Sequence, residues 1–171
     1  IDDFLLRRTG QKMDLDGEIA ARGKTDQGMI DTFLKHEFFT HLPPKSLDRE
    51  DFDGSIVESL SVEDGAATLT AMTVAAINKA QFHMPARPIR WLVCGGGRRN
   101  PTLMNMLSRM VNVPVEAVEA EGWDGDALEA QAFAFLALRH IDGLPISFPT
   151  TTNASYPLEG GVMVLPRGLS D

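Results

Sequence analysis

Residues 90–105, with the sequence RWLVCGGGRRNPTLMN, constrain the fold more than any other part of the chain. The apolar run at residues 91–94 is typical of a buried parallel strand, and three glycines end it. Asn100 can then cap a helix that has Pro101 at its first position. Apolar residues recur at helical spacing beyond it, namely Leu103, Met104, Leu107 and Met110. The stretch therefore predicts a strand, a glycine turn and a helix, in that order.

The glycine turn, which consists of Gly95, Gly96 and Gly97, has two interpretations. Glycine lacks a Cβ atom, so a ligand can approach the backbone at the carboxyl end of a strand, and a helix N-terminus favours a phosphate. A tight connection between strand and helix can use the same residues without any ligand. The three glycines and Asn100 are therefore candidate ligand-binding residues, and both interpretations stay open at this point.

Composition excludes several classes of protein. The net charge of −8 argues against an extended surface for nucleic acid or an anionic membrane, which needs clustered Lys and Arg. No apolar run approaches the length that spans a bilayer. Cys94 is the single cysteine, so the sequence offers no disulfide framework and no cysteine-based metal site. Its place in the apolar run predicts a buried, inert thiol, and a lone cysteine fits a reducing compartment.

The length of 171 residues predicts one domain, or half of a two-lobed protein. Because the chain begins with Ile1, we expect a fragment whose beginning is missing. Ser61 can cap a long helix at residues 61–80, whose alanines and threonines suggest close packing. Residues 113–118 predict a second strand parallel to the first, and residues 162–165 a final strand.

A further helix is expected between Trp123 and His140. Asp126 and Glu129 have the spacing of a variant capping box. A buried stripe is expected along this helix, formed by Ala130, Phe133, Leu136 and Ala137.

Two further residues allow a ligand role and a structural role. Lys45 could meet a phosphate or a substrate carboxylate, although a solvated loop lysine is the simpler explanation. Gly95, Gly97 and Asn100 nearly match the dinucleotide fingerprint, and Glu119 follows about 20 residues later, where a ribose-binding acid is expected. A solvated loop acid is the alternative for Glu119. A nicotinamide-dependent oxidoreductase is thus one hypothesis, but a doubly wound sheet needs more strands than the sequence offers.

Three longer motifs resemble the C-terminal part of the anhydro-N-acetylmuramic acid kinase family. They are CGGGRRNPTLM at residues 94–104, GWDGDALEAQAFA at 122–134 and LPISFPTTT at 144–152. Weaker similarities include RTG at residues 8–10, PPKS at 43–46, RE at 49–50 and GGV at 160–162. The sequence departs from the family at Leu47 and Asp48, where Thr-Gly is usual, and at Asn153, where Gly is usual.

This resemblance implies an α/β fold of the acetate and sugar kinase, Hsp70 and actin superfamily. Residues 1–171 would form the ribonuclease-H-like second lobe of a two-lobed kinase, helix-rich with a small mixed sheet. The implied reaction uses ATP and Mg²⁺ to hydrolyse the anhydro ring of 1,6-anhydro-N-acetylmuramic acid and to phosphorylate O6, in the bacterial cytoplasm. The phosphate-binding loop and the catalytic aspartate would precede Ile1, so the isolated chain is expected to be inactive, with no catalytic residue and no metal ligand of its own.

The resemblance also assigns roles to particular residues. It places Gly95, Gly96, Gly97 and Asn100 against the nucleotide. It directs Glu129 towards the sugar, a role that competes with the capping box for the same side chain. A non-catalytic interaction lobe, suggested by the alanine-faced helices, stays open beside the oxidoreductase hypothesis. The missing N-terminal lobe would be the main partner, and homodimer formation is left open.

Overall fold

The computed structural model describes residues 1–48, 51–52 and 54–164. The chain divides into two compact units. The first unit comprises Ile1–Leu42 and Ser46–Leu128, and the second comprises Pro43–Lys45 and Glu129–Asp171.

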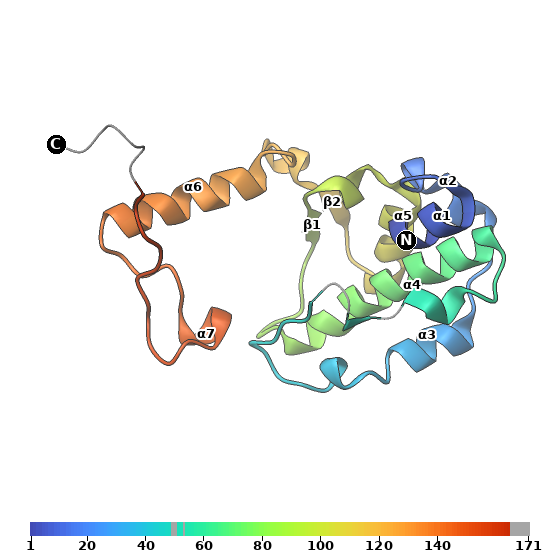
Figure 1. The fold of residues 1–171 in the computed structure, drawn as a ribbon, viewed down its shortest axis with the longest axis horizontal. Helices are drawn as coiled ribbons and strands as arrows, with labels where there is room; N and C mark the ends of the chain where they lie inside the picture. The colour runs from blue at the N-terminus through green and yellow to red at the C-terminus, as the bar shows by residue number, and fades with distance from the viewer. Residues whose placement is uncertain (49–50, 53, 165–171) are drawn as a thin grey trace. The chain divides into compact units, whose positions relative to one another are not determined.

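The helix α4, Val62–Ala80, is the central element of the first unit (Figure 1). It begins where predicted, because the Ser61 side chain accepts a hydrogen bond of 3.1 Å from the backbone N–H of Asp64. Four shorter helices pack against it, namely α1 (Asp2–Thr9), α2 (Glu18–Arg22), α3 (Gln27–Phe33) and α5 (Pro101–Val111).

Small side chains on α4 let the neighbouring helices approach closely. Ala66 and Thr68 are fully buried, which confirms the close packing expected from the alanines and threonines. Gly65 lies under the ring of Phe4 from α1, and a Cβ atom at position 65 would stand 2.8 Å from the ring atom Cε1. The main apolar core thus forms where α1, α2 and α3 meet α4.

The starts of α2 and α3 are fixed by aspartates. The Asp14 carboxylate accepts hydrogen bonds from the backbone N–H groups of Ile19 and Ala20, at 2.8 and 3.0 Å. The Asp26 side chain caps α3 by accepting from the N–H of Met29 at 2.9 Å. Short 3-10 turns connect these elements: η1 (Leu15–Gly17), η2 (Glu37–Phe39), η4 (Gly54–Val57), η5 (Gln81–His83), η6 (Gly96–Arg99) and η7 (Val118–Glu121).

The two predicted strands form a parallel pair. β1 (Trp91–Val93) pairs with β2 (Val115–Ala117), with Leu92 opposite Glu116. Apolar side chains from the pair pack against Val74 of α4 and against the buried residues of α5. All three residues of β1 are only half-buried, however, and Cys94 beyond its end is exposed, so the expectation of a buried thiol is wrong.

The expectation of a mixed sheet is also wrong for the described residues, whose only sheet is this parallel pair. Antiparallel pairing there is limited to an isolated bridge between Ser147 and Leu158. Val162 and Val164 are largely exposed, and no strand among the described residues pairs with them. Leu165, the last residue of the expected final strand, lies outside the described residues, as do residues 49–50 of the weaker family similarities.

The second unit contains most of α6 (Leu128–Ile141), the short helix α7 (Pro149–Thr152) and the bridge between Ser147 and Leu158. The stripe expected to be buried on α6 is not: Phe133 is 66% exposed, Ala130 and Ala137 are exposed, and Leu136 is half-buried. Helical spacing identified the helix correctly, but spacing alone does not supply a packing partner. No helix in the described ranges is both long and apolar enough to span a membrane.

Asn153, one of the departures from the family pattern, follows α7 in the left-handed conformation, with φ of 59°. Glycine is the usual residue in that conformation, and asparagine is among the few others that adopt it readily. The departure therefore preserves the local backbone.

Candidate functional site

The glycine turn follows β1 directly, and Gly95 has a φ of +72° that favours glycine. A Cβ atom at Gly95 or at Gly96 would meet nothing within 4 Å, so the backbone borders open space at both positions. At Gly97 a Cβ atom would lie 3.2 Å from Leu103 Cδ2, which makes this position more crowded. The side of the turn open to a ligand is therefore at Gly95 and Gly96.

A 3-10 turn, η6, separates the first glycine from α5, so the order is strand, glycine, 3-10 turn and helix. Asn100 caps α5 as predicted, because its side-chain oxygen accepts a hydrogen bond of 2.9 Å from the N–H of Leu103. Pro101 occupies the first turn of the helix. The Asn100 side-chain oxygen thus has a structural role, and the N-terminus of the helix lies several residues beyond Gly95.

Arg98, in the 3-10 turn, forms the densest group of polar contacts at the site. Its side chain is only 6% exposed. Its Nε donates to Glu119 Oε1 at 2.8 Å, and its Nη1 donates to Asp126 Oδ1 and to the carbonyl oxygen of Gly95, both at 2.9 Å. The same Asp126 carboxylate accepts a hydrogen bond from the more exposed Arg99. We call Arg98, Glu119 and Asp126 the arginine clasp.

The hydrogen bonds and charges in the clasp shift the pKa values of its three side chains. The hydrogen bond from Arg98 lowers the pKa of Asp126, and the hydrogen bonds to Asp126 and Glu119 raise the pKa of Arg98. The pKa of Glu119 is lowered first by a hydrogen bond from its own backbone N–H and then by the hydrogen bond from Arg98. All three groups are therefore held in their charged forms at neutral pH.

These contacts bear on two questions that the sequence left open. Glu119 is exposed, as expected of a loop acid, but it is also paired, since its Oε1 accepts from Arg98 and from the Gly125 N–H at 3.3 Å. The predicted capping box of α6 is wrong at its first residue, because Asp126 accepts from Arg98 and Arg99 instead. The N–H groups of Asp126 and Ala127 are bound by the Asp124 side chain, at 2.9 and 3.2 Å.

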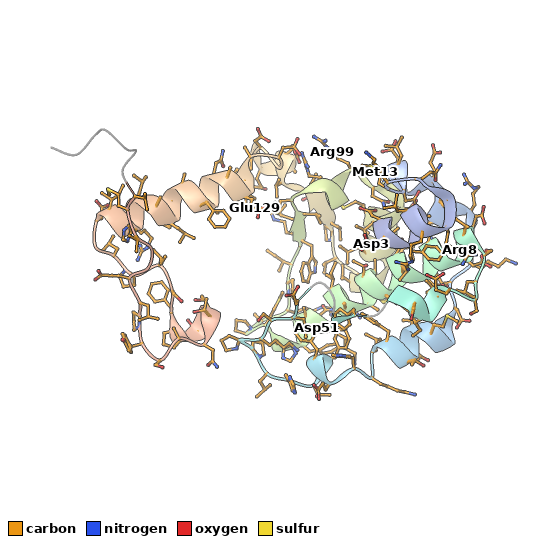
Figure 2. All side chains as sticks on the ribbon, viewed as in Figure 1. Asp3, Arg8, Met13, Asp51, Arg99 and Glu129 are labelled. Atoms are coloured by element: carbon orange, nitrogen blue, oxygen red, sulfur yellow. The ribbon has the colours of Figure 1, made fainter. Side chains whose placement is uncertain are left out.

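Glu129 lies exposed on the first turn of α6, in the second unit (Figure 2). In the predicted capping box Glu129 would accept from the backbone N–H of Asp126, but that N–H donates to Asp124 instead. Lys45 is half-buried and also belongs to the second unit, and its role stays a prediction. Within the described residues, no group of three or more His, Cys, Asp or Glu side chains is arranged to hold a metal ion.

The sequence patterns did not predict the arginine clasp. Arg98 and its acidic partners are 21 and 28 positions apart in the chain and show no periodicity. The one available signal was Gly125, between two aspartates, where a Cβ atom would stand 2.7 Å from Arg98 Cζ. A glycine between charged residues can mark a place where another side chain lies against the backbone.

Comparisons with known proteins agree on one family. The family model described as anhydro-N-acetylmuramic acid kinase matches residues 1–166. A protein of that name from Rhodospirillum rubrum is 55% identical over 161 residues, which cover 94% of this chain and 43% of the relative. Relatives of the same name from Paramagnetospirillum magneticum and Brucella anthropi are each 51% identical over 164 residues. These alignments cover 94% and 96% of this chain, and 46% and 44% of the respective relatives. The chain thus spans less than half the length of these relatives.

Proposed function

Because the chain belongs to the anhydro-N-acetylmuramic acid kinase family, we propose that it is the nucleotide-side lobe of such a kinase. The complete protein would use ATP and Mg²⁺ to open the anhydro ring of 1,6-anhydro-N-acetylmuramic acid. It would yield N-acetylmuramic acid 6-phosphate, in the cytoplasm. The observation that carries this proposal is the family match over residues 1–166, together with identities of 51–55% to relatives named for the activity.

The glycine turn supports the nucleotide half of the proposal. Backbone that borders open space at Gly95 and Gly96 lets a flat or charged ligand come within contact distance, which a Cβ atom would prevent. The turn stands at the carboxyl end of a parallel strand, where ligands of α/β proteins bind. We assign Gly95, Gly96 and Gly97 to nucleotide contact, and Asn100 to the helix start that holds the turn in place.

Glu129 is proposed as the sugar-binding residue. Its carboxylate is exposed on the first turn of α6, and the Asp126 N–H that it would cap is bound by Asp124, so it can accept hydrogen bonds from sugar hydroxyls. Such contacts would fix the orientation of the sugar for the reaction. Lys45 is not assigned a role.

The chemical steps are proposed to depend on residues outside this chain. Activation of water at the anomeric carbon needs a carboxylate base, and phosphoryl transfer needs a positioned metal and phosphate clamp. The described residues form no cluster that would hold Mg²⁺, so we assign no step through the ion to this chain. We therefore expect the isolated chain to lack kinase activity, and the ribonuclease-H-like lobe to act with an N-terminal lobe.

The oxidoreductase hypothesis is disfavoured by Glu119, the acid that it needs for ribose, because this residue binds Arg98 and the Gly125 N–H. The single parallel pair among the described strands also falls short of the sheet that a doubly wound fold requires. An interaction lobe without nucleotide binding is the second alternative, and the exposed apolar side chains of α6 are its support.

The decisive experiment assays the complete protein that contains this chain, with ATP, Mg²⁺ and 1,6-anhydro-N-acetylmuramic acid. We expect ATP-dependent formation of the 6-phosphate, and no reaction when NAD replaces ATP. Calorimetric titration of the isolated chain with magnesium ATP, with NAD as control, tests the nucleotide side separately. An active complete protein would still contradict our assignment of the lobe if Gly96→Val left the KM for ATP unchanged. Binding of NAD would overturn the kinase proposal.

A further inference from the structure

We propose that Arg98 is a positioning residue that holds the glycine turn in the shape that receives the nucleotide. This inference rests on the proposed nucleotide role of the turn and gives Gly95 and Gly96 different roles in it. Gly95 is held by the arginine clasp and its surrounding loop, and Gly96 is left as the point of ligand approach.

Both backbone polar groups of Gly95 are engaged. Its N–H donates to the carbonyl oxygen of Gly125 at 3.2 Å. Its carbonyl oxygen accepts from Arg98 Nη1 at 2.9 Å and from the Arg98 backbone N–H at 3.3 Å. The left-handed φ of Gly95 is thus fixed from both sides of the residue, and its own polar groups are occupied.

The loop on the other side of the clasp is fixed by the same guanidinium. Arg98 binds the carboxylates of Glu119 and Asp126, which stand on either side of Gly125 in the sequence. Glu119 also accepts from the Gly125 N–H at 3.3 Å. One side chain therefore links the glycine turn to the loop before α6 through three acceptors from three different residues.

The space for this arrangement exists only because residue 125 is glycine. Gly125 is buried, and a Cβ atom there would stand within 3 Å of Arg98 Cζ and Cδ. The guanidinium consequently lies against bare backbone, and its side chain is only 6% exposed although it comes from a surface turn. Its neighbour Arg99, which also binds Asp126, is by contrast 64% exposed.

Gly96 differs from Gly95 in this respect. It follows the fixed residue directly, and a Cβ atom on it would meet nothing within 4 Å. The Gly95 carbonyl and the Gly96 N–H belong to one planar peptide unit, so a rotation of that carbonyl would redirect the Gly96 N–H. Loss of the clasp should therefore move the nucleotide contact, whereas the sugar contact proposed for Glu129 depends on a different side chain and should be retained.

The test measures steady-state kinetics of the complete protein with the substitution Arg98→Ala. We expect the KM for ATP to rise by about tenfold or more, since misplacement by about 1 Å can have such an effect, while the KM for the sugar stays within about twofold. Arg98→Lys should give an intermediate KM for ATP, because an ammonium group can bind one carboxylate but cannot reach three acceptors in a fixed plane. A purely structural role would lower the amount of folded enzyme without this split between the two substrates.

Arg99→Ala is the matched control, since it removes the same charge from the next residue and one partner of Asp126. It should leave the KM for ATP within about twofold of the wild type. If Arg98→Ala does not fold, Glu119→Gln removes one acceptor charge with little change of shape and should raise the same KM.

The role of Arg98 and the role of the turn predict different results. If Gly96→Val raises the KM for ATP but Arg98→Ala and Glu119→Gln do not, the positioning role of Arg98 is wrong and the nucleotide role of the turn stands. If Gly96→Val also has no effect, the nucleotide role itself is wrong, and the inference about Arg98 falls with it. An equal rise in the KM for ATP for Arg98→Ala and Arg99→Ala would also overturn the inference, because the rise would then reflect the loss of a positive charge alone.

Discussion

Thr102 Oγ1 donates a hydrogen bond of 2.8 Å to the carbonyl oxygen of Gly17, a residue 85 positions earlier in the chain. Thr102 lies on the first turn of α5, next to the Asn100 cap, and Gly17 ends the 3-10 turn before α2. Gly17 has a φ of +69°, and a Cβ atom there would stand 2.7 Å from Thr102 Cβ. The N-terminal part of the chain thus packs directly against the helix start that follows the glycine turn.

Gly17→Ala should destabilise the first unit by about 2–4 kcal/mol, because it adds a collision to a left-handed backbone that alanine disfavours. Urea unfolding followed by circular dichroism measures the loss. Gly10→Ala is the control, since Gly10 has a φ of +77° but open space around its missing Cβ. That substitution should cost only about 1–2 kcal/mol from the backbone alone. Equal losses for the two variants would show that crowding at Gly17 contributes nothing.

Asn100→Ala should reduce the free energy of unfolding by about 1 kcal/mol, because the N–H of Leu103 loses the oxygen that caps it. Asn105 lies exposed on the same helix and provides the comparison. Asn105→Ala should be neutral or slightly stabilising, since alanine has the higher helix propensity. Chemical denaturation of both variants checks the difference, and a cost at Asn105 as large as that at Asn100 would contradict the capping role.

Leu107→Ala should cost about 2–5 kcal/mol, since Leu107 is only 2% exposed and packs with Val74 and Val111. Met110 is 48% exposed on the same helix, so Met110→Ala should change stability by less than about 1 kcal/mol. Shifts in the denaturation midpoint measure both effects, provided that the slope of unfolding free energy against denaturant concentration is unchanged. Similar losses at the two positions would mean that the packing of α5 differs from that described.

Stability should fall in acid partly through the arginine clasp. The pKa of Glu119 and that of Asp126 lie below their ordinary values of 4.5 and 3.8 in the folded chain. A depressed folded pKa contributes stability that is present above the unfolded value and is lost as the pH falls through the folded value. We therefore expect the contribution to fade as the pH drops below 4.5.

Urea unfolding of wild type and Arg98→Ala across this pH range provides the measurement. The variant should lose less stability than the wild type on acidification. Without Arg98, the pKa values of Glu119 and Asp126 should lie closer to those in the unfolded chain. Glu58, whose pKa is lowered by hydrogen bonding to Arg7, titrates with the same sign in both proteins and cancels in the comparison. Parallel stability curves would exclude an acid-sensitive clasp.

Glu129→Gln in the complete protein should lower kcat/KM for the sugar by about tenfold or more, since a charged acceptor of hydroxyl hydrogen bonds becomes a neutral one. Stability should hardly change, because the side chain is exposed. Gln131→Ala, at another exposed position of α6, is the control for local effects on the helix. Unchanged kinetics with the sugar after Glu129→Gln would remove this residue from the proposed site.

Elements whose signals are local could be predicted from the sequence. The caps at Ser61, Asp26 and Asn100 each depend on a side chain and a backbone N–H three residues apart, so short motifs reveal them. The parallel pairing of β1 with β2 followed from a strand, helix and strand in succession. The family resemblance, based on longer motifs, is confirmed.

Features that depend on distant partners could not be predicted. Burial of Cys94 was inferred from its apolar neighbours, but β1 ends at Val93 and the thiol stands beyond the packed strand. Phe133 has the spacing of a core residue, yet a periodic pattern does not tell whether another element covers it. Asp126 was interpreted through its nearest helix, whereas its partners come from the turn 27 and 28 positions away.

The charges of the clasp and of the neighbouring Arg99 determine how strongly a charged ligand is attracted to the turn. Arg98 and Arg99 carry two positive charges, and Glu119 and Asp126, with which they form ion pairs, carry two negative ones. The arginines are thus neutralised by protein acids and provide little net positive field for an approaching phosphate. A ligand would be held there by shape and backbone dipoles, so its affinity should depend only weakly on ionic strength.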